Sequence, residues 1–354
     1  MGTTDILEGL ERRDPAVLAR AISLVENQRD GFERVLAHAY STVVHGQTRR
    51  IGITGPPGAG KSTLTERLIQ EFRGRGLRVG VIAVDPTSPF TGGALLGDRI
   101  RMESLSLDPG VFIRSMATRG SYGGLATTTE EVADLLAAFG FERILIETVG
   151  VGQTELDVAG TAETTVLVLV PESGDGIQTL KAGVMEIADV YVINKSDRPG
   201  GDKLRQEVEV MLGIRRGNAF RHVAPHHRPA RRSGGKMESS SDAAARPPAY
   251  PPNWEPPVLA TVAVQGTGVA ELTEALDRHY DYLEASGALE VRRRERLRKR
   301  MRNVAERVVR QWVWEATRAD ELLEERFDEV ADGRKSPYDV AAEILEQVKS
   351  GALR

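Results

Sequence analysis

The stretch IGITGPPGAGKSTL, residues 51–64, decides the fold of this chain. It fits the pattern G-x-x-x-x-G-K-[S/T], with an apolar run before it and a helix-like run after it. Glycines at these spacings let successive backbone N–H groups face one point, where the following helix adds its positive end. The stretch therefore predicts a strand, a phosphate-binding loop and a helix, in that order.

The residues of this loop have separate expected roles. Lys61 is expected to reach the β- and γ-phosphates of a nucleotide, and the hydroxyl of Ser62 is expected to bind Mg²⁺. The remaining contacts come from the backbone of the loop. The nucleotide-binding residues predicted here are Gly55, Pro56, Pro57, Gly58, Ala59, Gly60, Lys61, Ser62 and Thr63.

A second motif, NKSD at residues 194–197, ends a predicted strand and indicates the base. The carboxylate of Asp197 can accept hydrogen bonds from guanine N1–H and the 2-amino group together, whereas adenine offers neither donor. Asn194 is expected to tie this loop to the phosphate loop, and Lys195 to lay its stem along the base. The two motifs together predict that the nucleotide is GTP.

Acidic residues stand at the ends of predicted strands. Asp85 ends the run VGVIAVD, Glu147 ends RILIE, and Asp98 follows in a glycine-rich loop. Nucleotides lie at the carboxyl ends of parallel strands, where acids can bind Mg²⁺ directly or through water. The predicted metal ligands are Ser62, Asp85, Asp98 and Glu147. Each of these acidic residues could instead cap a helix or form a salt bridge, without any role in metal binding. Gly150 is expected to present its N–H to the γ-phosphate.

Short runs rich in Val and Ile alternate with longer amphipathic segments from Arg50 onward. The runs are 51–54, 79–84, 111–114, 144–147, 165–170, 190–193 and 259–264. Continuous apolar strands separated by helices predict an α/β fold with a doubly wound, mainly parallel sheet of about seven strands. The predicted domains are an N-terminal helical segment (1–46), a nucleotide-binding domain (47–269) with a flexible Pro/Ser/Arg-rich insertion (216–257), and a C-terminal helical arm (270–354).

Composition excludes several classes of protein. The chain has no cysteine, which removes disulfides, thiolate metal sites and cysteine nucleophiles. Its net charge of −4 gives no general affinity for polyanions. No apolar stretch is long enough to span a bilayer and no signal peptide is recognisable, so we expect a cytoplasmic protein. The histidines at 222, 226 and 227 lack carboxylate or cysteine partners, which favours a solvated loop over a metal site.

The C-terminal arm carries one apolar stripe on a predicted helix: Leu297, Met301, Val304, Val308 and Trp312. Basic residues between positions 292 and 302 occupy the rest of that surface. A nucleic-acid or membrane patch is one interpretation. We favour a solvated helix whose stripe packs against a second subunit or the body of the domain, because acidic residues at 321–329 can balance the arginines.

Taken in order, several segments resemble one family. They are GPPGAGKST, VIAVDPTSPFTGGALLGDRIRM, TRGSYGGLA, ILIETVGVGQTE, PESGDGIQTLKAG and EIADVYVINKSD. The chain is similar to the MeaB-type GTPases, also catalogued as ArgK, the bacterial relatives of the methylmalonic aciduria type A protein. The resemblance runs from about residue 18 to residue 212 and resumes at 257. The combination of VDPTSP, GDRIRM and ETVGVGQ is narrower than the motifs shared by other GTPases.

This resemblance implies a GTP-binding and GTP-hydrolysing metallochaperone. Such a protein gates adenosylcobalamin loading and protects or reactivates methylmalonyl-CoA mutase or a related acyl-CoA mutase. The resemblance also implies bound Mg²⁺, GTP or GDP, a homodimer joined through helical arms, and a mobile loop at 175–181 that communicates with the mutase. By motif it assigns catalysis to Lys61, Glu147 and Gly150, and base binding to Asn194, Lys195 and Asp197. Gln265 belongs to the small loop expected after the last strand.

The chain departs from the family at three places. Ala117 and Ser121 stand where the family more often has Gly and His, and TVAVQGTG (261–268) lacks the usual Ser-Ala signature of the guanine loop. The insertion at 216–257 is also longer than expected. Three other classes of protein are alternatives. A nickel-type metal-insertion GTPase relies on Cys and His clusters, a P-loop small-molecule kinase would prefer ATP, and an RNA-associated GTPase would use residues 292–302. An activating charge could come from the partner or from Arg119, and the role of Gln153 is open.

Overall fold

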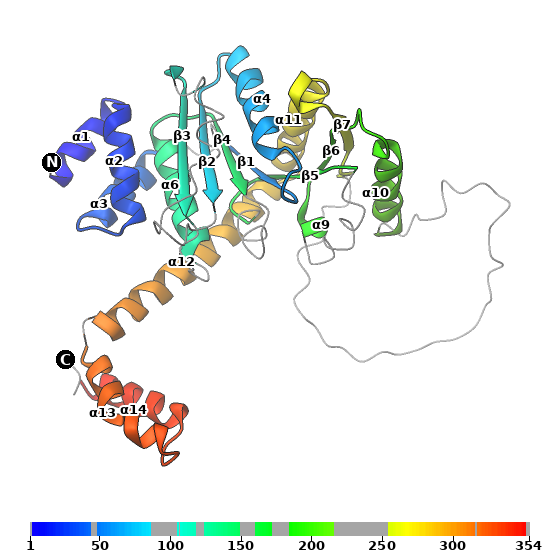
Figure 1. Cartoon of the computed structure of the whole chain (residues 1–354). Coiled ribbons are helices and arrows are strands. Elements are labelled where there is room, and N and C mark those ends of the chain that lie inside the picture. Colours follow the sequence, from blue (N-terminus) through cyan, green and yellow to red (C-terminus); the bar gives the residue numbers. More distant parts are fainter. Residues whose placement is uncertain are drawn as a thin grey trace, which may run out of the picture. The chain divides into compact units, whose positions relative to one another are not determined.

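A computed structural model describes residues 2–43, 48–85, 105, 107–117, 124–148, 160–171, 184–215, 254–315 and 317–351. The chain divides into two compact units, Met1–Arg293 and Arg294–Arg354, and each is described by itself. The first unit is built on a seven-stranded sheet (Figure 1). All of its pairings are parallel, in the order β3-β2-β4-β1-β5-β6-β7, which confirms the predicted fold class. The strands are β1 (Arg49–Thr54), β2 (Val79–Asp85), β3 (Val111–Ala117), β4 (Arg143–Thr148), β5 (Thr164–Leu169), β6 (Val190–Asn194) and β7 (Val258–Thr261).

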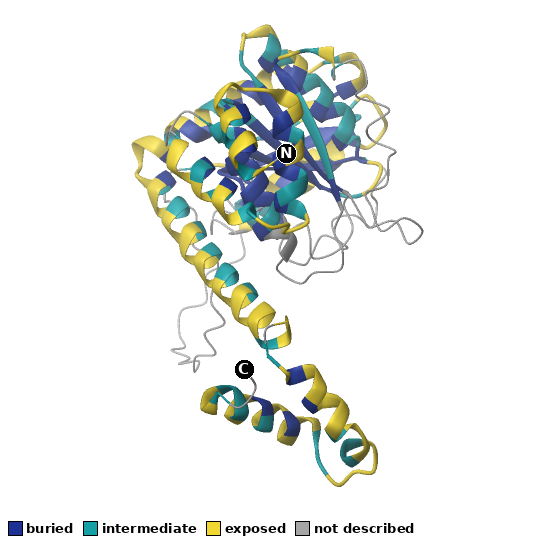
Figure 2. Ribbon diagram, turned by 90° about the vertical axis from the view of Figure 1, so that its left-hand side faces the viewer, coloured by how far each residue is buried: buried dark blue, intermediate teal, exposed yellow. Residues whose placement is uncertain are grey.

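Helices cover both faces of this sheet, so its inner strands are apolar on both sides. In β4, Ile144 and Ile146 join a core with α6 (Gly124–Ala138) and the N-terminal helices. Leu145 points to the other face, where α4 (Lys61–Gly74) and α11 (Val269–Ala285) pack. The short α9 (Val184–Ile187) and α10 (Gly201–Arg215) complete the covering beside β5 and β6. Figure 2 shows most of the strands as buried ribbon inside these helices.

Three helices precede the sheet: α1 (Thr3–Glu11), α2 (Pro15–Glu26) and α3 (Phe32–Thr42). Asp14 caps α2, because its side chain accepts hydrogen bonds from the N–H groups of Ala16 and Val17 at 2.8 and 3.4 Å. Pro15 at the first helical position has no N–H that would be left unpaired, so Asp14 and Pro15 together favour the start of a helix here. Its residues Leu18, Ala21, Ile22 and Val25 are fully buried against the sheet and α6.

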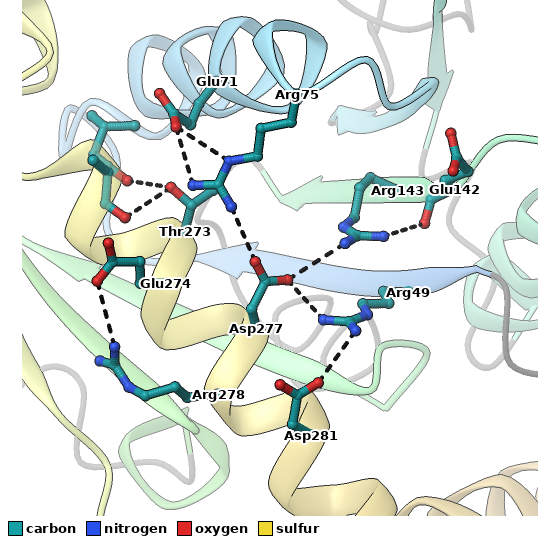
Figure 3. A network of polar contacts seen from close by, with 12 residues as sticks. Arg49, Glu71, Arg75, Glu142, Arg143, Thr273, Glu274, Asp277, Arg278 and Asp281 are labelled. Carbon is teal, nitrogen blue, oxygen red and sulfur yellow. Dashed lines mark hydrogen bonds and ion pairs between the residues drawn. The ribbon is translucent and has the colours of Figure 1, made fainter.

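Arginines at the amino ends of the strands converge on α11 (Figure 3). Asp277 accepts hydrogen bonds from Arg49, Arg75 and Arg143 at 2.7, 3.1 and 3.4 Å. Arg49 begins β1, Arg143 begins β4, and Arg75 follows α4, so one carboxylate holds two helices against two strands. This network lies at the amino ends of the strands, whereas the phosphate loop lies at their carboxyl ends.

The last strand is shorter than the sequence predicted. We expected it over 259–264, but β7 ends at Thr261 and Ala263–Gln265 form a 3₁₀ turn, η3. β7 is an edge strand with one neighbour, β6, so little sheet pairing holds its end. Val262 instead forms an isolated antiparallel bridge with Thr267, which closes the loop before α11.

The second unit contains most of α12 (Ala288–Glu315) together with α13 (Ala319–Ala331) and α14 (Pro337–Ser350). Ser336 begins α14 with a capping box, and Ala319, Leu322, Val340 and Ile344 form a small core between α13 and α14. Most of α12 is exposed in this chain (Figure 2). None of the helices in the described part of the chain combines the length and the apolar character needed to cross a membrane.

Candidate nucleotide-binding site

The phosphate loop joins β1 to α4 and is held against two other strand ends. Gly55 and Gly60 have φ angles of 142° and 85°, which side-chain-bearing residues rarely adopt. A Cβ on Gly55 would stand 2.1 Å from the carbonyl oxygen of Val168 in β5, and one on Gly60 would stand 2.4 Å from Nδ2 of Asn194. The two glycines therefore permit the loop to lie close to the carboxyl ends of β5 and β6.

Lys61 is buried at the start of α4. Its ammonium donates hydrogen bonds to the carbonyl oxygens of Gly55 and Pro56 at 2.8 and 3.1 Å. Only 6% of the residue is exposed, so its charge is held at the loop rather than in bulk solvent. A phosphate group bound at the N-terminus of α4 would meet this ammonium and the backbone N–H groups together.

Ser62 and Glu147 form the polar contact between α4 and β4. The Ser62 hydroxyl donates to Oε1 of Glu147 at 2.7 Å, and Glu147 is only 4% exposed. Glu147 lies beside Ile53 in the register of β1 with β4, which brings the carboxylate next to the phosphate loop. Hydroxyl and carboxylate oxygens are the hard ligands that Mg²⁺ prefers, so this pair fits the ion. Mg²⁺ bound there would neutralise phosphate charge.

The other predicted metal and switch residues are only partly described. Asp85 is the last residue of β2, so its backbone lies at the same edge of the sheet as Glu147. The side chain of Asp85 lies outside the described residues, as do Asp98, Gly150, Arg119, Ser121, Gln153, residues 172–183 and the histidines of the insertion. Among the described residues, no group of three or more His, Asp or Glu side chains could hold a metal ion. Mg²⁺ sites built from one or two protein ligands plus substrate phosphates need no such group.

Asn194 connects the phosphate loop to the loop after β7. Its Nδ2 donates to the carbonyl oxygen of Ala59 at 2.8 Å, which is the contact expected from the sequence. Its Oδ1 accepts from the hydroxyl of Thr261 and from the backbone N–H of Ala263, each at 3.1 Å. All three bonds are buried, so the amide orients both loops at once.

The NKSD turn itself is anchored on one side and open on the other. Lys195 adopts a left-handed backbone with φ 53°, which is uncommon for a side-chain-bearing residue. Ser196 donates both its N–H and its hydroxyl to the carbonyl oxygen of Thr261 at 3.1 Å. Asp197 and Gln265 are exposed, so both side chains are accessible to a ligand.

One residue that contacts the site was not predicted from the sequence. Arg67 on α4 donates hydrogen bonds to the carbonyl oxygens of Ala263 and Val264 at 3.0 and 2.6 Å. An arginine on a helix surface carries no signal of a backbone contact that is remote in the chain. The described site therefore joins Lys61, Ser62, Glu147, Asn194, Asp197 and Gln265 at the carboxyl edge of the sheet, with Arg67 behind the last loop.

A phosphate loop after β1 and an NKSD turn after β6, on one parallel sheet, define a P-loop GTPase. A family model described as "Methylmalonyl Co-A mutase-associated GTPase MeaB" matches residues 18–318. The chain belongs to this MeaB family, which confirms the resemblance recognised in the sequence.

Relatives that align with most of the chain support this assignment. A relative from Pyrococcus abyssi, classed by its name among the GTPases, is 42% identical over 349 residues, covering 99% of this chain and 98% of its own. The mitochondrial methylmalonic aciduria type A homolog of Mus musculus is 36% identical over 297 residues, with 80% and 65% covered. GTPase ArgK of Escherichia coli is 33% identical over 283 residues, with 79% and 77% covered. A crystal structure of a LAO/AO transport system kinase aligns with a TM-score of 0.62 and 25% identity, covering 98% of this chain and 97% of its own.

Proposed function

We propose that this GTPase serves an adenosylcobalamin-dependent acyl-CoA mutase, of which methylmalonyl-CoA mutase is the best candidate. It gates loading of the cobalamin cofactor and protects or reactivates the mutase. The observation that carries this proposal is the family match over residues 18–318, because that family is described by its association with the mutase. The name of the mouse relative refers to a disorder of methylmalonate, which supports the same client.

The proposed site divides the nucleotide between two loops. Asp197 reads guanine, Lys195 covers one face of the base, and Asn194 holds the base loop against the phosphate loop. The exposure of Asp197 supports this division, because a buried carboxylate could not receive a base. Lys61 and the N–H groups of residues 55–63 bind the phosphates. Gln265 borders the base from the loop after β7.

Hydrolysis in this proposal is an in-line attack of water on the γ-phosphate. The protein contributes position and charge neutralisation rather than a covalent intermediate. Lys61 stabilises charge on the phosphate oxygens, Glu147 orders the water and metal shell, and Gly150 presents its N–H to the γ-phosphate. Ser62, Asp85, Asp98 and Glu147 are the proposed Mg²⁺ residues.

The GTPase acts on its client through two nucleotide states. Hydrolysis can do work on a mutase only if the GTP and GDP forms bind it with different affinities. The test is a titration of the full chain into the host's adenosylcobalamin-dependent mutase, once with GDP and once with a non-hydrolysable GTP analogue. We expect dissociation constants that differ by about tenfold or more, within the usual range of coupling energies. Equal affinities in the two states would contradict the proposed role.

The base assignment predicts a change of purine preference. Asp197→Asn should weaken GTP binding by about 100-fold or more, because the amide cannot accept from both guanine donors. The same variant should bind xanthosine triphosphate, whose 2-oxo group accepts from the new amide. Asp202→Asn, at an exposed acid in the first turn of α10, is the matched control and should leave both affinities unchanged. Calorimetric titration measures both, and unaltered GTP binding in Asp197→Asn would refute the assignment.

A further inference from the structure

Arg67 links the helix of the phosphate loop to the loop after β7. Its Nε donates to the carbonyl oxygen of Ala263 at 3.0 Å and its Nη2 to that of Val264 at 2.6 Å. Nη1 donates to Oε1 of Gln70, one turn further along α4, at 3.0 Å. The planar guanidinium therefore engages two successive carbonyl groups of η3, and its remaining amino group contacts an exposed neighbour on its own helix.

The same turn is held from its other side by the NKSD segment. The backbone N–H of Ala263 donates to Oδ1 of Asn194 at 3.1 Å. Asn194 thus binds the donor side of this peptide segment and Arg67 binds its acceptor side. Moving either partner would shift η3 relative to the turn that carries Asp197.

Packing alone gives η3 little support. Ala263 is buried, but Val264 is 68% exposed and Gln265 is exposed as well. β7, which leads into the turn, has only four residues and lies at the edge of the sheet. The position of η3 therefore depends mainly on polar contacts, and those made by a charged donor are the stronger ones.

We propose that Arg67 is a positioning residue for guanine recognition. It holds η3 at the distance from the NKSD turn at which the two segments enclose the base, and it ties this base loop to the helix that receives the phosphates. The inference rests on the proposed function, in which Asp197 reads guanine and Asn194 holds the base loop against the phosphate loop. It adds a determinant of base specificity that lies on the phosphate helix.

The test compares affinities for a guanine nucleotide, an adenine nucleotide and a ligand without a base. The full chain and its Arg67→Leu variant are titrated with GDP, ADP and tripolyphosphate. We expect Arg67→Leu to weaken GDP binding about tenfold, the effect of losing charge-assisted hydrogen bonds that order the loop. ADP and tripolyphosphate affinities should change by less than about twofold, because the phosphate loop keeps its own contacts.

Two further variants separate positioning from charge and from general stability. Arg67→Lys keeps the positive charge but not the two-pronged donor, so it should lose GDP affinity nearly as far as Arg67→Leu. Gln70→Leu removes only the partner of Nη1 and should leave all three affinities unchanged. If Arg67→Leu folds poorly, Arg67→Lys supplies the same comparison.

The possible outcomes distinguish this inference from the proposed function. An equal loss of GDP and tripolyphosphate affinity would overturn the inference, because Arg67 would then act on the phosphate site or on the fold. Unchanged GDP affinity and base preference in Arg67→Leu would overturn it too, while leaving the base assignment intact. A wild-type chain that binds ADP as tightly as GDP would overturn the base assignment and the inference together.

Discussion

At the scale of single residues, Gly60 of the phosphate loop lies very close to the side chain of Asn194. Gly58 and Gly60 both have left-handed backbones, with φ of 75° and 85°. They differ in their surroundings, since a Cβ on Gly58 would meet no atom within 4 Å whereas one on Gly60 would lie 2.4 Å from Nδ2 of Asn194. Substitutions at Gly58 and Gly60 can therefore distinguish the cost of backbone strain from the cost of displacing the Asn194 side chain.

We expect Gly60→Ala to destabilise the nucleotide-free protein more than Gly58→Ala. Each substitution costs about 1–2 kcal/mol for a left-handed alanine. Gly60→Ala also displaces Asn194 from the Ala59 carbonyl and leaves a buried polar group unsatisfied, which adds about 1–3 kcal/mol. Urea unfolding without nucleotide measures both variants while excluding ligand contacts. Equal losses in the two variants would contradict the role of this close approach.

Individual site residues could be predicted from the sequence where their role depends on neighbouring residues in the chain. The glycine spacing and Lys61 are read directly from the loop, and Asn194 from its tetrapeptide. It did not reach Arg67, because the partners of that side chain are backbone carbonyls about two hundred residues away in the sequence. A carbonyl has no residue identity, so no pattern in the sequence records the contact.

At the scale of elements, Asp189 joins the segments at the amino end of β6. Its carboxylate accepts from the N–H of Thr165 and from Nη2 of Arg292, each at 2.9 Å, and Nε2 of His279 lies 3.3 Å away. Its backbone carbonyl accepts from the indole N–H of Trp254 at 3.0 Å, and the Trp254 ring packs against that of His279. β5, β6, α11 and the first turns of α12 therefore meet at one buried carboxylate.

This carboxylate predicts an acid-dependent contribution to stability. Burial alone would raise the pKa of Asp189, but its interactions with His279 and Arg292 outweigh burial and hold the pKa below its ordinary value. A depressed carboxyl pKa stabilises the fold fully above the unfolded pKa of about 4, and the contribution is lost as pH falls through the lower folded value.

Asp189→Asn should therefore lower the free energy of unfolding at pH 7 by about 3 kcal/mol, because it leaves Arg292 without its buried counter-charge. The difference from wild type should shrink as pH falls below about 4, because the carboxyl of the unfolded chain binds a proton before the native one does. Urea unfolding across pH 3–7 measures the difference, with exposed Asp202→Asn as the control. A difference that stayed constant over this range would contradict a charge-dependent role for Asp189.

The elements themselves were largely predictable, because runs of Val and Ile bounded by helical segments have few alternative folds. The end of β7 was not. Residues 262–264 read as apolar strand, but their conformation is set by Asn194 and Arg67, which belong to other elements. The strand order and the cluster around Asp189 could not be predicted from the sequence either, because both depend on which segments become neighbours in space.

At the scale of the whole molecule, α12 carries an apolar stripe that this single chain leaves uncovered. Leu297, Met301, Val308 and Trp312 are 39%, 65%, 57% and 43% exposed. They recur at helical spacing, so they lie on one face of α12. Apolar stripes of this kind mark interfaces, and the resemblance to MeaB-type GTPases implies a homodimer joined through its helical arms. We therefore expect the stripe to be the contact between two copies of the chain.

A charge placed in the middle of the stripe should dissociate that dimer. Val308→Asp would bury a carboxylate in an apolar interface and should weaken dimerisation by about 100-fold, or about 3 kcal/mol. Arg310→Gln, on the opposite face of the same helix, changes the net charge by the same one unit and should leave the dimer intact. Sedimentation should give the chain mass of 38.6 kDa for Val308→Asp and twice that mass for wild type and control.

GTP hydrolysis without the mutase should persist in Val308→Asp, because the phosphate loop and NKSD turn lie in the first compact unit. A wild-type chain that sediments as a monomer would remove the interface, and a Val308→Asp dimer of unchanged affinity would place the contact elsewhere.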